Sequence, residues 1–162
     1  MQKTTRILLL GCLCALAALA QPARYSATTG DVTLSAAGTK FTIQQPATGA
    51  KQVRLEAATV YCSVACDLTQ SQNGAAATST AGTASPVLPI GRAALATVWT
   101  ASNVGAGTPA GGILHLQGGV GTERTLELSS ITMGNTGTGT NYTFVISSIT
   151  GTANITLYWS EQ

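Results

Sequence analysis

The chain has 162 residues, of which 44% are hydrophobic and only 9% are charged, and its formal net charge is +2. This composition excludes an intrinsically disordered protein, which combines low hydrophobicity with high net charge. It contains no basic cluster, so nucleic acid and anionic membrane surfaces are not expected partners.

The first 20 residues have the pattern of a secretory signal peptide. Lys3 and Arg6 precede an apolar stretch that is too short for a membrane span, and Ala18-Leu19-Ala20 resembles a cleavage site. Cleavage before Gln21 would leave six basic and six acidic residues, hence zero net charge and no membrane span. The alternative is a lipoprotein, because Leu9-Leu10-Gly11-Cys12 resembles a lipobox. The expected location is extracellular or at the cell surface, with the periplasm as a further candidate.

Most of the remaining chain alternates polar and apolar residues, as half-buried strands do. After a flexible N-terminal segment at 21–30, strands are predicted at Val32–Ser35, Lys40–Gln45, Gln52–Tyr61, Asp67–Gln72, Leu95–Ala101, Gly112–Gln117 and Thr125–Ile131, followed by a C-terminal pair. Pro86 and Pro89 exclude a central strand from the low-complexity segment Gly74–Gly91, which is predicted to be a long loop with at most a short edge strand. About eight to nine short strands without an amphipathic helix predict one antiparallel β-sandwich domain at 31–162, jelly-roll or immunoglobulin-like.

Cys62 and Cys66 are the only cysteines beyond residue 20. Zinc needs about four ligands, and the spacing differs from the Cys-x-x-Cys of thioredoxin-like pairs. A hairpin turning at Val64 would place Cys62 opposite Cys66 and Val60 opposite Leu68, at a separation that a disulfide bridges. We therefore predict a Cys62–Cys66 disulfide that stiffens an exposed loop tip, with a functional redox pair or free thiols as the alternatives.

The C-terminal segment 141–162 predicts a hairpin with its turn at Thr150-Gly151. A one-residue slip would mix its apolar and polar faces, so the alternation in both runs specifies the register. The polar positions Thr143, Ser147, Asn154 and Thr156 should face away from the core. One buried face should hold Tyr142, Phe144, Ile146, Ile155, Leu157 and Trp159.

No constellation in the sequence indicates catalysis. The single histidine, His115, has no accompanying Gly-x-Ser-x-Gly motif and is expected to be a structural residue. Glu123 and Glu127 would lie about 13 Å apart along a strand, farther than a glycosidase carboxyl pair. The acidic residues are scattered and form no calcium loop. We expect a non-enzymatic protein without a cofactor or metal.

Three non-enzymatic functions fit these features. The first is a structural or adhesive subunit of an extracellular or virion-surface assembly, which would self-associate or bind another surface protein; in composition the chain is similar to secreted pilins, surface adhesins and virion-surface proteins. The second is a carbohydrate-binding module, for which Tyr158, Tyr61 and Trp99 are candidate stacking residues. The third is a domain that donates Arg24–Ser35 as a strand to a partner.

Overall fold

The computed structural model describes residues 22–45, 51–72, 80–82, 85–88, 93–101, 108–128, 131–133 and 141–162. The expected signal peptide lies outside these ranges. The described residues form strands, and among them there is no helix with the length and apolar character to span a membrane.

The strands form two sheets, here called sheet A and sheet B. Sheet A contains β1 (Ala23–Thr28), β2 (Val32–Thr33), β4 (Val53–Cys62), β7 (Ser85–Leu88), β11 (Arg124–Glu127), β12 (Thr132–Met133) and β14 (Thr152–Glu161). Sheet B contains β3 (Thr39–Gln44), β5 (Cys66–Gln72), β6 (Thr80–Gly82), β8 (Thr97–Ala101), β9 (Thr108–Pro109), β10 (Leu114–Leu116) and β13 (Asn141–Ser147).

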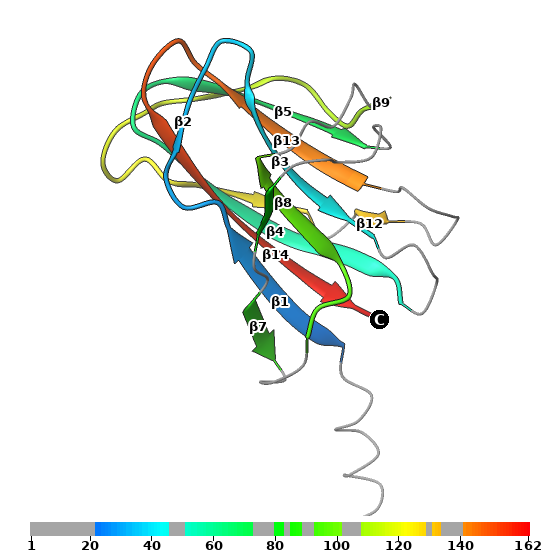
Figure 1. Cartoon of the computed structure of the whole chain (residues 1–162). Coiled ribbons are helices and arrows are strands. Elements are labelled where there is room, and N and C mark those ends of the chain that lie inside the picture. Colours follow the sequence, from blue (N-terminus) through cyan, green and yellow to red (C-terminus); the bar gives the residue numbers. More distant parts are fainter. Residues whose placement is uncertain are drawn as a thin grey trace, which may run out of the picture.

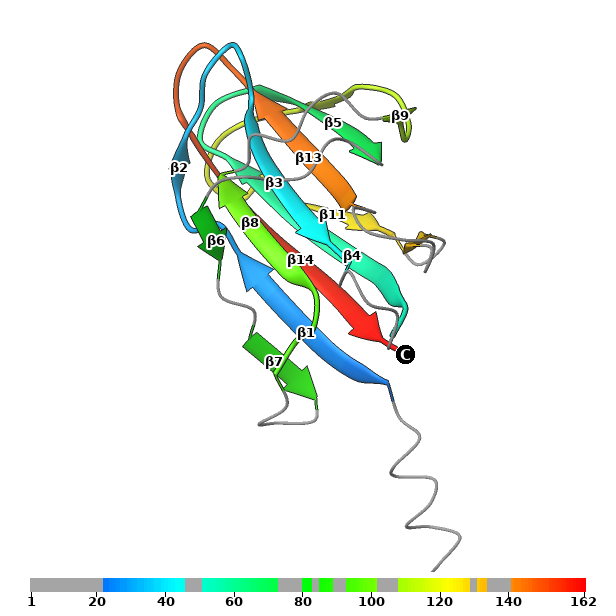
Figure 2. The ribbon, with the colours of Figure 1, turned by 45° about the vertical axis from the view of Figure 1, so that its right-hand side comes forward.

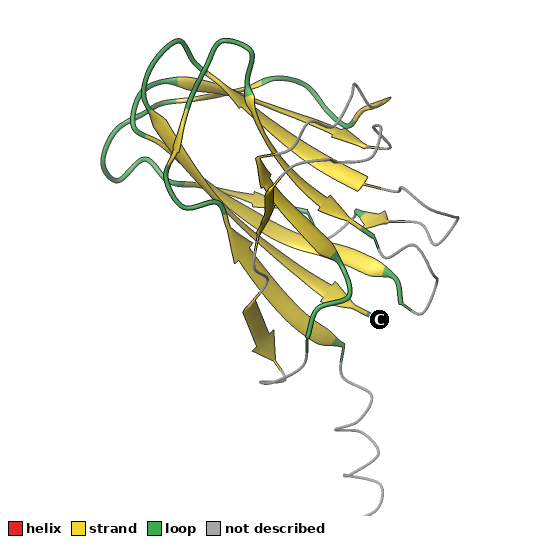
Figure 3. Cartoon of the chain, viewed as in Figure 1, coloured by secondary structure: helices red, strands yellow, loops and turns green. Residues whose placement is uncertain are grey.

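The two antiparallel sheets pack face to face, so the predicted β-sandwich is confirmed (Figure 1, Figure 3). The order is β11-β4-β14-β1-β7 in sheet A and β10-β5-β13-β3-β8-β6 in sheet B. The structure has more strands than the eight or nine expected, because the strands at the edges of both sheets are short and interrupted. β9 and β10 both pair with β5, and β11 and β12 both pair with β4.

The segment predicted to be a long loop carries the short strands β6 and β7. β7 lies at the edge of sheet A, and it contains Pro86. An edge tolerates a residue without a backbone N–H, which agrees with the exclusion of a central strand.

The expectation of a flexible N-terminal segment at 21–30 is wrong, because β1 occupies most of it. β1 pairs with β14 along its length and with β7 on its other side. Tyr25 is buried and stacks on Trp159 with the ring centroids 5.7 Å apart. Arg24–Ser35 is therefore not a free strand for donation, since withdrawing it would expose the core side of sheet A.

Both predicted hairpins are also wrong, because each connection crosses from one sheet to the other. β4 and β5 lie in different sheets, as do β13 and β14. Val60 does not face Leu68; it lies opposite Ile155, while Leu68 lies opposite Ile146. We call the two connections, residues 63–65 and 148–151, the arches.

The two arches contact each other at one end of the sandwich. The Ser63 N–H donates to the Thr152 carbonyl, and the Thr152 N–H donates to the Ser63 hydroxyl oxygen, both at 2.8 Å. Gly151 has a φ of 94°, and a Cβ at this position would come within 2.5 Å of Val64 Cγ2. Glycine at this position thus permits the close approach of the arches. It also adopts the left-handed backbone conformation without strain.

The Cys62–Cys66 disulfide is confirmed, but it joins the two sheets inside the core. The two Cα atoms are 6.4 Å apart, and the residues are only 1% and 4% exposed. The exposed part of the arch is its turn, with Val64 36% exposed. The bond therefore links the buried ends of β4 and β5 at the base of the arch, and it does not stiffen an exposed loop tip. Such a bond fits an oxidising compartment.

The double substitution Cys62→Ala with Cys66→Ala is expected to lower the free energy of unfolding by about 2–4 kcal/mol. Closure of so short a loop contributes roughly 2 kcal/mol, and the lost burial of the sulfur atoms adds to it. Urea unfolding measures the loss, with Ala65→Ser on the exposed turn as a control expected to have little effect. Alkylation of both thiols in unfolded, unreduced protein would contradict the bond.

The predicted burial of the C-terminal strands is confirmed, although their pairing was wrong. The inward residues are at most 2% exposed: Tyr142, Phe144, Ile146, Ile155, Leu157 and Trp159. They belong to two facing sheets instead of one. Ser147, Asn154 and Thr156 are half-buried. Thr143, which was also expected on the outward polar face, is instead buried, and its hydroxyl lies 2.9 Å from that of Thr42.

Two polar groups are held inside the fold by specific partners. Burial raises the pKa of Tyr142 to about 12, and its hydroxyl donates to Gln70 Oε1 at 2.6 Å. Glu161 is 1% exposed, and its Oε1 accepts from the backbone N–H groups of Leu95 at 2.9 Å and Ala96 at 3.0 Å. This carboxylate thereby ties the end of β14 to the segment that leads into β8.

Candidate functional site

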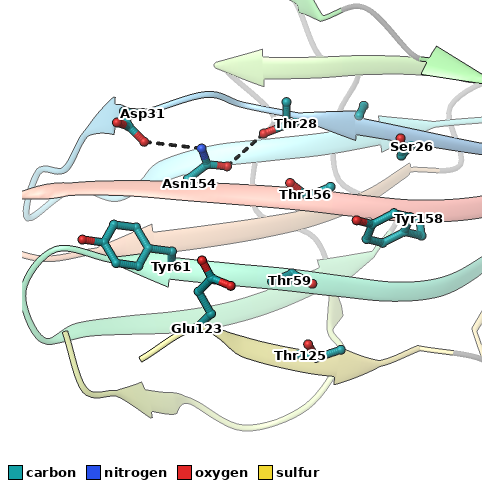
Figure 4. Close-up of a pocket in the computed structure, with 11 residues that line it drawn as sticks. Ser26, Thr28, Asp31, Thr59, Tyr61, Glu123, Thr125, Asn154, Thr156 and Tyr158 are labelled. Atoms are coloured by element: carbon teal, nitrogen blue, oxygen red, sulfur yellow. Dashed lines mark hydrogen bonds between the residues drawn. The ribbon is translucent and has the colours of Figure 1, made fainter. Parts of the chain in front are cut away.

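The outer face of sheet A carries an open polar groove of about 750 Å³ (Figure 4). Strands β11, β4, β14 and β1 form its floor, since alternate residues of each strand point away from the core. The groove therefore consists of side chains from four chain segments that are distant in sequence.

Four threonines form a row across the middle of this groove. Thr125 lies opposite Thr59, Thr59 opposite Thr156, and Thr156 opposite Thr28. Opposed residues on one sheet face have Cβ atoms about 4.5–5.5 Å apart. The Thr28 hydroxyl donates to Asn154 Oδ1 at 2.9 Å, whereas the other three hydroxyls bond to no residue of the described chain. Three regularly spaced hydroxyls are thus available to a ligand.

Two tyrosines flank the threonine row along the strand direction. Tyr61 lies opposite Asn154 and Tyr158 opposite Ala57, so their positions differ by four residues in register, or about 13 Å. Tyr158 is 38% exposed and Tyr61 is half-buried. Figure 4 shows the two rings near opposite ends of the labelled residues, with Thr156 and Thr59 between them. The groove therefore offers an aromatic surface on each side of the hydroxyls.

The electrostatic character of the groove is acidic near the arches. Asp31 and Glu123 line this end, and Asn154 Nδ2 donates to Asp31 Oδ1 at 3.4 Å. Together with the bond from Thr28, this contact fixes the orientation of the Asn154 amide. The described residues that line the groove include no lysine or arginine. An anionic ligand such as a phosphate or sulfate would lack a counter-charge here.

The groove continues past Tyr158 into a smaller hollow of about 350 Å³. Tyr158 lines both cavities, and Arg24 and Glu56 form an ion pair at 3.4 Å beside the smaller one. The charge of Arg24 is therefore already compensated. The two cavities are thus neighbours on the outer face of sheet A, with Tyr158 between them.

Two of the three aromatic residues singled out from the sequence, Tyr61 and Tyr158, lie in this groove. Trp99 does not, because it belongs to β8 in sheet B, where its half-buried indole Nε1 donates to Gln44 Oε1 at 3.1 Å. Sequence reasoning missed the threonines, since only the pairing of the four strands makes them neighbours. The alternation of each strand was the sole signal that they would face outward.

The other polar residues considered from the sequence lie elsewhere or remain apart. His115 is exposed on β10 in sheet B, with its Nδ1 2.7 Å from Asp67 Oδ1. Glu123 and Glu127 are both exposed and belong to the region of β11. Within the described ranges no three His, Cys, Asp or Glu side chains gather closely enough to hold a metal ion.

Comparison with protein-family models, with curated proteins and with solved structures finds no match. The functional argument therefore depends on the chemistry of the groove itself. Its distinguishing features are free hydroxyl groups, two flanking tyrosines and the lack of a cation among the described lining residues.

Proposed function

We propose that this protein is an exported, non-enzymatic adhesive surface protein that binds a neutral glycan chain in the groove of sheet A. The observation that carries the proposal is the row of free threonine hydroxyls between Tyr61 and Tyr158. A sugar ring has hydroxyls that donate and accept hydrogen bonds, and it has an apolar face. Threonine hydroxyls match the first property, and the flat apolar body of tyrosine matches the second.

The charge of the groove supports a neutral glycan over an anionic one. Asp31 and Glu123 can each accept hydrogen bonds from sugar hydroxyls, and a carboxylate is a strong acceptor. The same carboxylates would repel sulfate or uronate groups. The separation of the two tyrosines favours an oligosaccharide, because a single sugar would contact only one of them.

The strand order supports the proposal by analogy only. We interpret it as a jelly roll and not an immunoglobulin-like fold, since eight strands follow the orders β1-β14-β4-β11 and β3-β13-β5-β10. Jelly rolls occur in lectin and viral capsid domains. Because one fold hosts many functions, the groove and not the topology carries the assignment.

Export to the cell surface or the extracellular space is part of the proposal. Its support is the signal-like N-terminus together with the buried disulfide, a bond that persists in oxidising compartments. A glycan-binding face on an exported protein would hold it to a cell surface or to an extracellular polymer.

Tyr158→Ala is expected to weaken glycan binding about tenfold, because it removes one stacking surface. Hits from an array of neutral oligosaccharides would supply the ligand for titration calorimetry. Trp99→Phe, outside the groove, is the control and should leave the affinity unchanged. Failure of all neutral glycans to bind at millimolar concentration, or equal affinities of the wild type and Tyr158→Ala, would overturn the proposal.

A further inference from the structure

A second cavity of about 840 Å³ lies at the side of the sandwich, between the edges of the two sheets. β10 lines one side, and β11 with Leu128 and Ile131 lines the other; Figure 2 shows β11 at the margin of sheet A. Within the described residues β10 pairs only with β5 and β11 only with β4, so both outer edges are open. The apolar lining comprises Leu114, Leu116, Leu126, Leu128 and Ile131.

The backbone of β11 indicates what kind of ligand fits this cleft. The Leu128 N–H donates to the Glu56 carbonyl at 2.9 Å, toward β4. Since the direction alternates along a strand, the N–H and C=O groups of Thr125 and Glu127 point toward the open edge. A hydrocarbon ligand would cover these groups without hydrogen bonds, at a cost in free energy. An extended peptide would satisfy them, so the cleft favours a peptide over a lipid.

The side chains of β11 specify the chemistry of that peptide. Arg124 lines the cleft and is paired with no carboxylate in the described part of the chain. Directly opposed residues of two strands share one face of the sheet. A partner strand therefore needs an acidic residue opposite Arg124, apolar residues opposite Leu126 and Leu128, and a basic residue opposite Glu127.

We propose that the open edge of β11 accepts an antiparallel strand from a partner protein. In the N-to-C direction this strand has the pattern apolar, basic, apolar, polar, acidic. Its apolar side chains fill the cleft between the sheets, and its acidic side chain pairs with Arg124. The strand extends sheet A beside the groove and does not depend on glycan binding. The molecule thus acts as a strand acceptor, in contrast to the donor role that was one of the three alternatives from the sequence.

The test uses the peptide acetyl-Thr-Val-Lys-Val-Thr-Glu-Thr-amide and the whole mature chain. Bound peptide is expected to slow hydrogen exchange at the amides of Thr125 and Glu127, measured by NMR, because these groups gain partners. The amide of Leu126 already faces β4 and should change little. The isomer with lysine and glutamate exchanged is expected to bind about tenfold more weakly.

The variant Arg124→Glu provides the matched control, since Arg124 is exposed and its replacement leaves the core intact. It is expected to abolish the preference between the two peptides, because each peptide then places its lysine opposite one glutamate and its own glutamate opposite the other. Absence of binding at millimolar peptide, or protection at strands other than β11, would overturn the proposal. Equal binding of both isomers to the wild-type protein would overturn the pairing with Arg124. Binding of palmitate but not of peptide would identify a lipid site instead. Peptide-induced protection of the Thr125 amide that persists in the Tyr158→Ala variant would show that the strand-binding edge acts independently of the glycan groove.

Discussion

Phe144→Ala is expected to lower the free energy of unfolding by about 3–5 kcal/mol. Phe144 is fully buried in β13, with ring centroids 6.4 Å from Phe41 and 5.3 Å from Tyr142. The substitution removes buried apolar area and leaves a cavity that two hydrogen-bonded sheets cannot fully close. The loss is a large share of the 5–15 kcal/mol or so that stabilises a typical domain.

Thr156→Ala is the matched control for this substitution. Thr156 lies on the outer face of β14 and is half-buried, and its hydroxyl makes no hydrogen bond to another described residue. Its truncation is expected to cost well under about 1 kcal/mol. Urea unfolding followed by circular dichroism measures both variants. Equal losses would contradict the assignment of inner and outer faces to the C-terminal strands.

Glu161→Ala is expected to lower the free energy of unfolding by about 2–4 kcal/mol, although the residue is second to last in the chain. The buried carboxylate accepts from two consecutive backbone N–H groups, those of Leu95 and Ala96. Trp159 Nε1 lies 3.4 Å from the same oxygen. Alanine would leave these donors without an acceptor; the Ala96 N–H and the Trp159 Nε1–H are buried, and an unpaired buried donor costs its full desolvation free energy.

Two further variants separate the hydrogen bonds from the charge. Glu161→Gln keeps an acceptor oxygen and is expected to retain part of the lost stability. Gln162→Ala alters the exposed neighbouring side chain and should have little effect. Urea unfolding ranks the three variants. A Glu161→Ala variant as stable as Gln162→Ala would show that the carboxylate does not hold residues 93–96 to β14.

The sequence by itself determined which large apolar side chains face the core in the C-terminal strands. Phe144 and Leu157 alternate with polar residues, and alternation depends only on the local geometry of an extended chain. The positions of most strands followed from the same pattern. The disulfide could also be predicted, because the signal-like N-terminal pattern and the cysteine spacing are local features.

The pairing of the strands was decided by the tertiary structure alone. Both sheets direct apolar residues into one core, so an arch between sheets buries the same residues as a hairpin within one sheet. Phe144 and Leu157 satisfy either arrangement. β14 lies instead between β4 and β1, whose residues are far from it in sequence. No local pattern distinguishes these partners, and for the same reason the sequence alone predicts a flexible segment where β1 lies.

The same distinction between local sequence pattern and strand pairing holds for the residues of the candidate site. Tyr61 and Tyr158 could be proposed from residue type, because aromatic residues at outward positions are recognisable in a strand pattern. The threonine row could not, since Thr28, Thr59 and Thr125 reach Thr156 only through the register of four strands. Sequence alternation sets the face on which a side chain lies, but cross-strand neighbours depend on contacts between distant segments. The tertiary structure therefore decided the chemistry of the groove.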